Sequence, residues 1–358
     1  KLPIAYGHFW IFYLQNGKMD KALDFFNKKY KISSENDSKQ QILMALGNIS
    51  LIHNIRGEYD KSLKIFEEVL DISENINDLR NQSLTYGNKG IIYKNLKKYE
   101  ESLENYFKQI EISTKMEDLF SKSNAYDGIG VVYLKIKKYK EAKDEILKAI
   151  EIKKKIKDQN GYASSLNNLA EAMIGLGEVS KSIDLLNKAI DIFKQLDNLR
   201  AMHICSSELA KAFMLNDDFK NSIPIFKESL DFFIEIKDFS SFIKYAPNLS
   251  KCYYNNKNYS KAIEVLNNSI NYNKSSTIDI DIELAIINCM QTETSDMLKD
   301  ILNMNITDEQ CAYIHFNIGT ILADKKELEI SKKIFLKLFK KYNDFSYNYF
   351  IKKIKWFA

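Results

Sequence analysis

Hydrophobic and polar positions along the chain repeat with a fixed spacing. The stretch YGNKGIIYKNLKKYEESLENYFKQI, from Tyr86, reappears in modified form 40 residues later as YDGIGVVYLKIKKYKEAKDEILKAI, from Tyr126. Related stretches begin at residues 6, 46, 166, 206 and 246, so seven copies follow one another without an insertion. A fixed period of this size is typical of a solenoid, in which each repeat packs against its neighbours.

Within each copy the apolar side chains recur at helical spacing. In the copy that starts at Tyr86, a first helix carries Gly90 and Tyr93 on one face. A short turn follows at residues 96–98, and a second helix then carries Tyr106 on its inner face. Each copy therefore predicts a pair of antiparallel helices joined by a tight turn.

Small residues recur where the two helices of a pair must approach each other. In the first helix they are Gly90, Gly130, Ala170, Ala210 and Ser250. In the second helix they are Ala22, Ser62, Ser102, Ala142, Ser182, Ser222 and Ala262. Large residues such as Tyr93 follow three positions after the first set, and this alternation is what close helix packing requires.

The two glycines of GNKG, Gly87 and Gly90, raise the alternative of a phosphate-binding loop. Such a loop follows a strand and opens a helix, or continues into the G-K-[ST] signature of a nucleotide-binding loop. Neither context surrounds these glycines. We therefore interpret Gly90 as a packing residue.

Four features together resemble the tetratricopeptide repeat. They are the small residue of the first helix, the aromatic residue after it, the aromatic residue before the second helix, and the pattern Ala-x-x-x-Phe-x-x-Ala in the second helix. The resemblance implies an all-α, right-handed α-solenoid of about nine helix–turn–helix repeats. The unit here has 40 residues, so each helix is expected to be about three residues longer than in the usual 34-residue unit. The long unit is similar to that of bacterial quorum-sensing peptide receptors of the Rap/RRNPP type.

The end of the chain departs from the regular pattern. We expect seven regular units in residues 1–273, an irregular short helical pair and a final repeat in residues 274–345, and a capping helix in residues 346–358. The 40-residue repeat loses its register near residues 274–310, which is compatible with a hinge or with a harmless deletion. Pro247 interrupts a predicted first helix, where a kink or a late helix start is expected because proline lacks the N–H group.

Composition and charge narrow the function classes. Basic and acidic residues number 52 and 48, a balance that does not indicate direct nucleic-acid binding. With only 3 prolines and 12 glycines, the chain lacks the turn residues of a β-rich protein. Runs of lysine near helix ends are interpreted as solvated faces.

The location is predicted from cysteine usage and hydropathy. The four cysteines form no C-x-x-C pair, which is typical of free thiols in a reducing compartment. There is no apolar run of membrane-spanning length and no signal peptide, so a cytoplasmic protein without a membrane partner is expected. Because the chain begins with Lys1 rather than methionine, we expect an upstream segment.

Residues typical of catalysis are scarce. The four histidines lie in four different units, and no H-E-x-x-H, G-x-S-x-G or EF-hand motif occurs. An open groove also seldom provides the closed, dry site that catalytic groups need. We therefore expect no enzymatic activity, no cofactor and no bound metal.

The predicted fold presents a concave surface, and asparagine recurs on it two positions before the small residue of the first helix. An asparagine amide offers both a donor and an acceptor, so it can pair with the backbone of any extended peptide. The resemblance implies that such inner-wall residues clamp the ligand. The candidate ligand-binding residues are Asn48, Asn88, Asn167, Asn168, Glu171, Glu208, Lys211, Asn248, Lys251 and Tyr254. The alternative is that asparagine is common at this position whether or not a peptide binds.

Two function classes follow. The first is a sensor that binds a peptide or a protein segment and regulates a signalling protein by a change of curvature. The second is a static protein–protein scaffold that forms one region of a larger regulatory or defence protein. The sequence favours the sensor narrowly and leaves a homodimer open.

Overall fold

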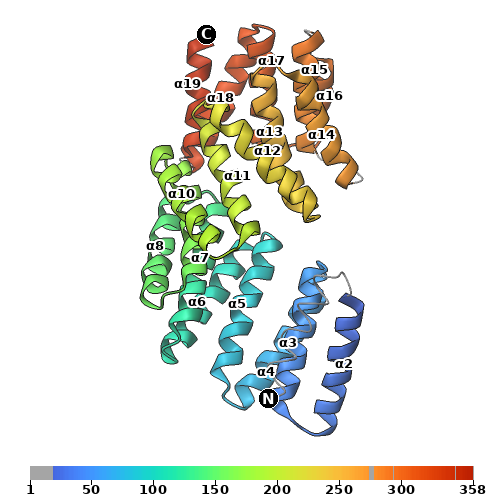
Figure 1. Ribbon diagram of the computed structural model, residues 1–358, viewed down its shortest axis with the longest axis vertical. Helices are drawn as coiled ribbons and strands as arrows, with labels where there is room; N and C mark the ends of the chain where they lie inside the picture. Colours follow the sequence, from blue (N-terminus) through green and yellow to red (C-terminus); the bar gives the residue numbers. More distant parts are fainter. Residues whose placement is uncertain (1–18, 274–277, 293, 343, 358) are drawn as a thin grey trace. The chain divides into compact units, whose positions relative to one another are not determined.

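The computed structural model of the chain describes residues 19–273, 278–292, 294–342 and 344–357. Within these ranges the protein is all-α and contains no strand (Figure 1). The first helix predicted for the unit at Tyr6 lies outside the described residues. The chain divides between Val132 and Tyr133 into two compact units, which are called here the N-terminal unit and the C-terminal unit. Helix α7 contains this boundary.

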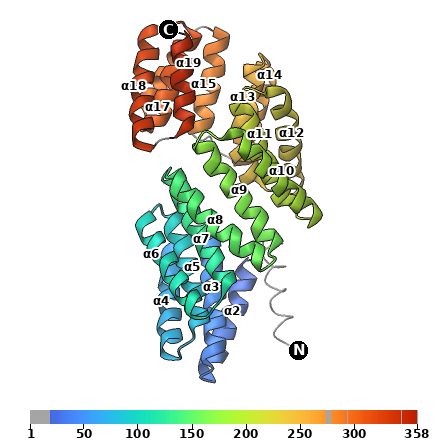
Figure 2. The same cartoon turned by 90° about the vertical axis from the view of Figure 1, so that its left-hand side faces the viewer.

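The regular part of the chain repeats every 20 residues, because each 17-residue helix is followed by a three-residue turn. The helices are α2 (Met19–Glu35), α3 (Lys39–Ile55), α4 (Tyr59–Asn75), α5 (Leu79–Asn95), α6 (Tyr99–Lys115), α7 (Leu119–Lys135), α8 (Tyr139–Lys155), α9 (Gln159–Gly175), α10 (Val179–Gln195), α11 (Leu199–Leu215), α12 (Phe219–Glu235) and α13 (Phe239–Asn255). Within each unit, consecutive helices pack side by side (Figure 2). The prediction of an α-solenoid built from helix pairs is confirmed, and the predicted turn at residues 96–98 is the turn between α5 and α6.

Each turn ends its helix with a residue in the left-handed conformation. After α3, the N–H groups of Gly57 and Glu58 donate to the carbonyls of Asn54 and His53, both at 2.9 Å. This is the Schellman motif, which satisfies carbonyls that the helix end leaves unpaired. Among the described residues, glycine occupies the left-handed position at Gly57 and Gly177, and elsewhere the position holds lysine, asparagine or an acid, or alanine at Ala323.

Acidic or amide side chains mark the start of the first helices α5, α7, α9, α11 and α13 at 40-residue intervals. Asp78, Asp158 and Asp238 each accept a hydrogen bond from the backbone N–H three residues later. Asp118 and Asn198 do the same. Such caps satisfy backbone donors that lie before the first helical hydrogen bond.

The small residues lie where the sequence predicts close helix contacts. The hydroxyl of Ser102 in α6 donates to the carbonyl of Gly90 in α5 at 2.7 Å, and Ser222 donates to the carbonyl of Ala210 at 2.8 Å. A Cβ atom on Gly90 would lie 2.9 Å from the ring of Tyr106. Gly90 is therefore a packing residue, as predicted.

The helices of the C-terminal part differ in length, and those after Asn273 do not follow the regular 20-residue spacing. They are α14 (Tyr259–Asn273), α15 (Ile278–Thr292), α16 (Asp296–Leu302), α17 (Asp308–Ile321), α18 (Lys325–Tyr342) and α19 (Phe345–Phe357). The predicted domain limits at residues 273 and 345 stay predictions. The late helix start expected at Pro247 is wrong, because α13 begins at Phe239 and continues through the proline. Pro247 lines the groove, and its missing N–H leaves the helix without one bond to the carbonyl four residues earlier.

Candidate functional site

A groove of about 580 Å³ lies in the C-terminal unit. Helices α11, α13, α15 and α17 supply its polar side chains, and α18 and α19 each supply one phenylalanine. Its lining comprises Glu208, Lys211, Lys244, Tyr245, Pro247, Asn248, Lys251, Asp279, Ile282, Glu283, Thr307, Glu309, Gln310, Tyr313, Phe335 and Phe350. Seven of these side chains carry a formal charge, so the groove is an electrostatic site more than an apolar one.

Glu208 on α11 is the centre of the first charge cluster. Its carboxylate accepts hydrogen bonds from Lys244 at 3.0 Å and from the Tyr245 hydroxyl at 2.8 Å, and Lys211 lies at 3.7 Å. Burial alone would raise the pKa of Glu208, but the two ammonium groups and the hydroxyl lower it to about 2. Glu208 is therefore a fixed negative charge at neutral pH.

Lys251 and Glu283 form the second cluster. The Lys251 ammonium lies 2.9 Å from the Glu283 carboxylate and 4.6 Å from the centre of the Tyr313 ring. Glu283 is only 3% exposed, and this burial raises its pKa despite the neighbouring lysine. Burial lowers the pKa of Lys251, but Glu283 and Tyr313 outweigh it and raise the pKa above its ordinary value. Lys251 is therefore held cationic at the base of the groove.

The accessible charges divide between the two sides of the groove. Lys244 on α13 has a side chain that is 61% exposed, and Lys211 on α11 is half-buried. Asp279 on α15 and Glu309 on α17 are exposed on the other helices. Lys244 and Lys211 also pair with Glu208, and Glu309 pairs with Lys137, but the exposed parts of these side chains stay accessible to a ligand. A ligand with groups of both signs fits this division.

The structure places the ten predicted site residues in three places. Glu208, Lys211, Asn248 and Lys251 line the groove, and Tyr254 lies buried behind it with its hydroxyl 2.9 Å from that of Tyr313. The other five predicted residues are outside it: Asn167, Asn168 and Glu171 on α9, and Asn48 and Asn88 in the N-terminal unit. Whether any of them touches a ligand stays a prediction.

Two of the asparagines differ in how their amides are satisfied. Asn48 donates to the carbonyl of Met44 in its own helix at 2.6 Å. Asn167 has a buried Oδ1 atom that accepts no hydrogen bond from the part of the chain that the structure describes. An amide that already bonds its own helix offers less to a ligand, so Asn48 is the weaker candidate of the two.

Sequence reasoning missed several groove residues. Lys244 could have been found, because it lies four and seven positions before Asn248 and Lys251 on the same helix face. Glu283, Glu309 and Tyr313 could not, because they follow the change of register after Asn273. Their position on the inner face depends on how α15 and α17 pack, which no repeat pattern reports.

The comparisons with known proteins agree with this architecture. The family model described as tetratricopeptide repeat matches residues 41–115 and 121–195. The repeats in these two ranges match the tetratricopeptide repeat. Such repeats form protein-interaction modules. A search of the curated proteins found no significant match.

Several solved structures resemble the chain along most of its length. Aspartyl phosphate phosphatase F from Bacillus subtilis aligns with a TM-score of 0.63 and 14% identity over 93% of this chain and 91% of its own. A Rap protein complexed with competence and sporulation factor aligns with a TM-score of 0.57 and 15% identity, covering 95% and 98%. These likenesses establish the fold alone.

A third similar structure belongs to a larger protein. It is a signal transduction ATPase with numerous domains, with a tetratricopeptide repeat sensor, from Pyrococcus horikoshii, and it has a TM-score of 0.59 and 19% identity. The alignment covers 93% of this chain and 52% of that one. Structures similar to this chain therefore occur both as nearly complete chains and as parts of longer ones.

Among the described residues, no group of three or more histidine, cysteine, aspartate or glutamate side chains could hold a metal ion. None of the described helices combines the length and the apolar character required to cross a bilayer. Cys205, Cys252 and Cys289 are buried free thiols, and Cys311 is a half-buried one.

Proposed function

We propose that the chain is a non-enzymatic sensor module that binds a short peptide or an extended protein segment in the groove of its C-terminal unit. The observation that carries this proposal is the groove itself, with its charged groups fixed before any ligand arrives. Its volume of about 580 Å³ lies in the range of sites that take a small ligand or a few residues of a peptide. Fixed charges reduce the ordering cost of binding.

The chemistry of the lining favours a peptide over an apolar ligand. Asn248 presents an amide that can pair with peptide N–H and C=O groups. The exposed Lys244 and the half-buried Lys211 can hold a carboxylate, and the exposed Asp279 and Glu309 can hold an ammonium or guanidinium group. A short peptide carries both kinds of group at its termini or in its side chains.

A regulatory role draws support from two similar structures. One is named as a Rap protein in complex with competence and sporulation factor, and another is named as a signalling ATPase with a tetratricopeptide sensor. We infer a comparable sensor role for this chain in a signalling protein. The free thiols support a cytoplasmic location, where cysteines stay reduced.

A static scaffold is the second candidate, and one observation favours it. The N-terminal unit exposes apolar side chains on the helix positions that correspond to the groove residues, among them Met44, Leu84 and Ile91. Exposed apolar residues at regular spacing suit a folded partner or an apolar segment. In this case the regular repeats would bind without a change of curvature.

Capture of peptides from the source cells tests the groove assignment. The purified chain and a Lys244→Ala, Lys211→Ala variant are incubated with the same peptide extract, and retained peptides are identified by mass spectrometry. We expect peptides retained by the wild type and lost from the variant, whose helical circular dichroism is checked first because both lysines neutralise the largely buried Glu208. Lys97→Ala, at a turn of the N-terminal unit, is the control and should retain them. Equal retention by all three proteins would refute the assignment.

A further inference from the structure

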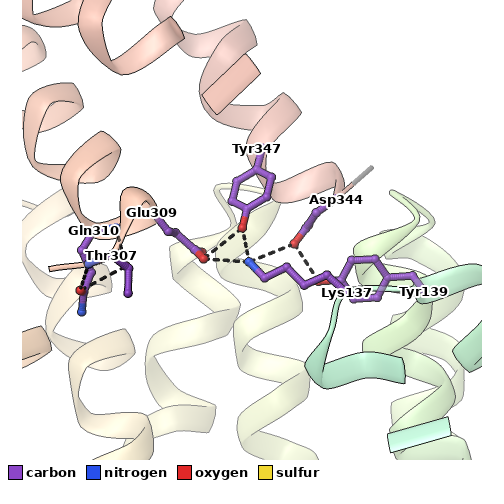
Figure 3. Close-up of polar contacts among 7 residues, drawn as sticks. All are labelled: Lys137, Tyr139, Thr307, Glu309, Gln310, Asp344 and Tyr347. Atoms are coloured by element: carbon purple, nitrogen blue, oxygen red, sulfur yellow. Dashed lines mark hydrogen bonds and ion pairs between the residues drawn. The ribbon is translucent and has the colours of Figure 1, made fainter. Parts of the chain in front are cut away.

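Lys137, at the turn between α7 and α8, lies in a third cluster of polar side chains. Its ammonium group is 2.8 Å from the carboxylate of Glu309, donates to the hydroxyl of Tyr347, and lies 3.7 Å from the carboxylate of Asp344 (Figure 3). The Lys137 side chain is half-buried. The turn thus places one cation among groups that come from α17, from α19 and from the residue before α19.

Aromatic rings complete the surroundings of this cation. The ammonium lies 4.5 Å from the centre of the Tyr347 ring and 5.6 Å from that of Tyr342. The Tyr347 hydroxyl donates to Glu309 at 3.0 Å. Carboxylates together with the faces of aromatic rings are the combination that recognises ammonium groups.

The geometry of the pocket is fixed by buried groups rather than by Lys137 alone. Asp344 and Tyr347 are almost fully buried. The Tyr139 hydroxyl donates at 2.7 Å to the same Asp344 oxygen that Lys137 approaches, so the carboxylate keeps one partner independently of the lysine. A pocket organised in this way should keep its shape when the lysine side chain is removed.

The contact also joins parts of the C-terminal unit that stacking alone would not bring together. Lys137 and Tyr347 are 210 positions apart, whereas repeats of a solenoid contact mainly their neighbours. Helix α19 also packs against α9, and Lys353 pairs with Asp217 at the turn after α11 at 3.0 Å. Helix α19 therefore lies across several repeats of the C-terminal unit.

Movement of α19 would change the groove. Phe350 of α19 lines the groove and stacks on Phe335, with 4.8 Å between ring centres. Glu309 belongs both to the groove lining and to the surroundings of Lys137. The surroundings of Lys137 and the groove therefore share one acid, Glu309, and one wall, helix α19.

We propose that Glu309, Asp344, Tyr342 and Tyr347 form a binding site for a primary ammonium group, and that Lys137 is its resident ligand. The site is named here the ammonium pocket. An external primary ammonium, such as a peptide amino terminus or a lysine side chain, fits the same groups. Its entry would displace Lys137 and release α19. This inference goes beyond the proposed function, since it holds whether or not the groove binds a peptide.

Chemical rescue of a truncated lysine tests the proposal. Lys137→Ala removes the three methylene groups and the ammonium beyond Cβ, and thereby leaves space for n-propylammonium. In the full chain we expect amide hydrogen exchange in α19 to become about tenfold faster in this variant, as expected for loss of a half-buried ion pair. Added n-propylammonium should restore slow exchange in α19, and n-propanol, a neutral molecule of similar shape, should not.

A matched control and a second variant make the outcome decisive. Lys97→Ala truncates the lysine at the equivalent left-handed turn position in the N-terminal unit and should leave α19 exchange unchanged. Exchange in Lys137→Ala equal to that in Lys97→Ala would overturn the proposal. So would restoration by propanol, or no restoration by propylammonium. If Lys137→Ala fails to fold, Glu309→Gln, at a half-exposed side chain, must accelerate α19 exchange, and unchanged exchange there also overturns it.

Discussion

The inner faces of the two units carry different chemistry on the same backbone. In the N-terminal unit, Met44, Leu84 and Ile91 are exposed on this face, with exposed fractions of 49%, 46% and 38%. The positions that correspond to Leu84 and Ile91, four repeats later, are Lys244 and Lys251. Asn88, between them in sequence, corresponds to Asn248.

The comparison teaches that packing and binding use separate positions of the repeat. Buried positions of the first helix keep the same pattern of burial in both units, because every helix pair must pack in the same way. Only the inner-face positions are free to change from apolar to charged. Differences in function between the units must therefore arise from these few positions and from the irregular helices α15 to α19.

The largest effect is expected from breaking the ion pair of the C-terminal groove. Lys251→Met leaves Glu283 buried without its cation and should lower the free energy of unfolding by about 3–5 kcal/mol. The corresponding N-terminal change, Ile91→Met, should stay within about 0.5 kcal/mol because the side chain is exposed and apolar. Denaturant unfolding measures both. Similar losses in the two variants would remove the distinction between the faces.

A double substitution sharpens this result. Lys251→Met with Glu283→Met removes both charges and should recover most of the stability, since paired buried charges are often no better than apolar side chains. No recovery would show that Lys251 acts through packing rather than through its charge.

The pH dependence of stability gives the second effect. The pKa of Glu208 is lowered in the folded protein to about 2 from an ordinary value of 4.5, so its ionised form stabilises the fold above pH 4.5. This contribution, about 3–4 kcal/mol from the size of the shift, is lost as the pH falls from 4.5 toward 2. The difference in melting temperature between wild type and Glu208→Gln should shrink over that range. A constant difference would contradict the assignment of Glu208 as a fixed charge.

Helix packing, which the two units share, gives a third effect. Gly90→Leu should destabilise the N-terminal unit by about 1–3 kcal/mol through overpacking against Tyr106. Gly47→Ala is the control, because a Cβ there meets no atom within 4 Å, and it should stabilise its helix by about 0.5–1 kcal/mol. Thermal unfolding of both variants measures this contrast. If both substitutions changed the free energy of unfolding in the same direction, Gly90 would not be a packing position.

The smallest effect is expected at the turns. Lys97→Gly relieves a left-handed lysine, with φ of 60°, and should stabilise by roughly 0.5–1 kcal/mol. Lys137→Gly relieves the same conformation but also removes the ammonium, so it should destabilise. Melting temperatures that move in the same direction would mean that the Lys137 contacts contribute little.

The sequence predicts the regular solenoid well because both its packing and its turns repeat. Gly90, Ser102 and the turn at residues 96–98 lie where the pattern requires. The capping residues, such as Asp78, recur at 40-residue intervals and also indicate where the first helices begin. Left-handed turns without glycine, as at Lys97, leave no clear signal, because the repeat packing and not the residue imposes the conformation.

The candidate site is only partly predictable. Glu208 and Lys251 follow from the repeat because they occupy an inner-face position. Glu283 and Glu309 belong to helices whose register the repeat does not fix, so their approach to the groove depends on tertiary packing. The ammonium pocket depends on a contact between Lys137 and residues more than 170 positions away, which no local pattern can indicate.

Hydrogen exchange of the full chain, with and without the peptides retained from the cell extract, tests the central claim most directly. Binding in the C-terminal groove predicts slower exchange in α11, α13, α15 and α17 and unchanged exchange in α3 and α5. Protection confined to α3 and α5, or no protection in either unit, would contradict it.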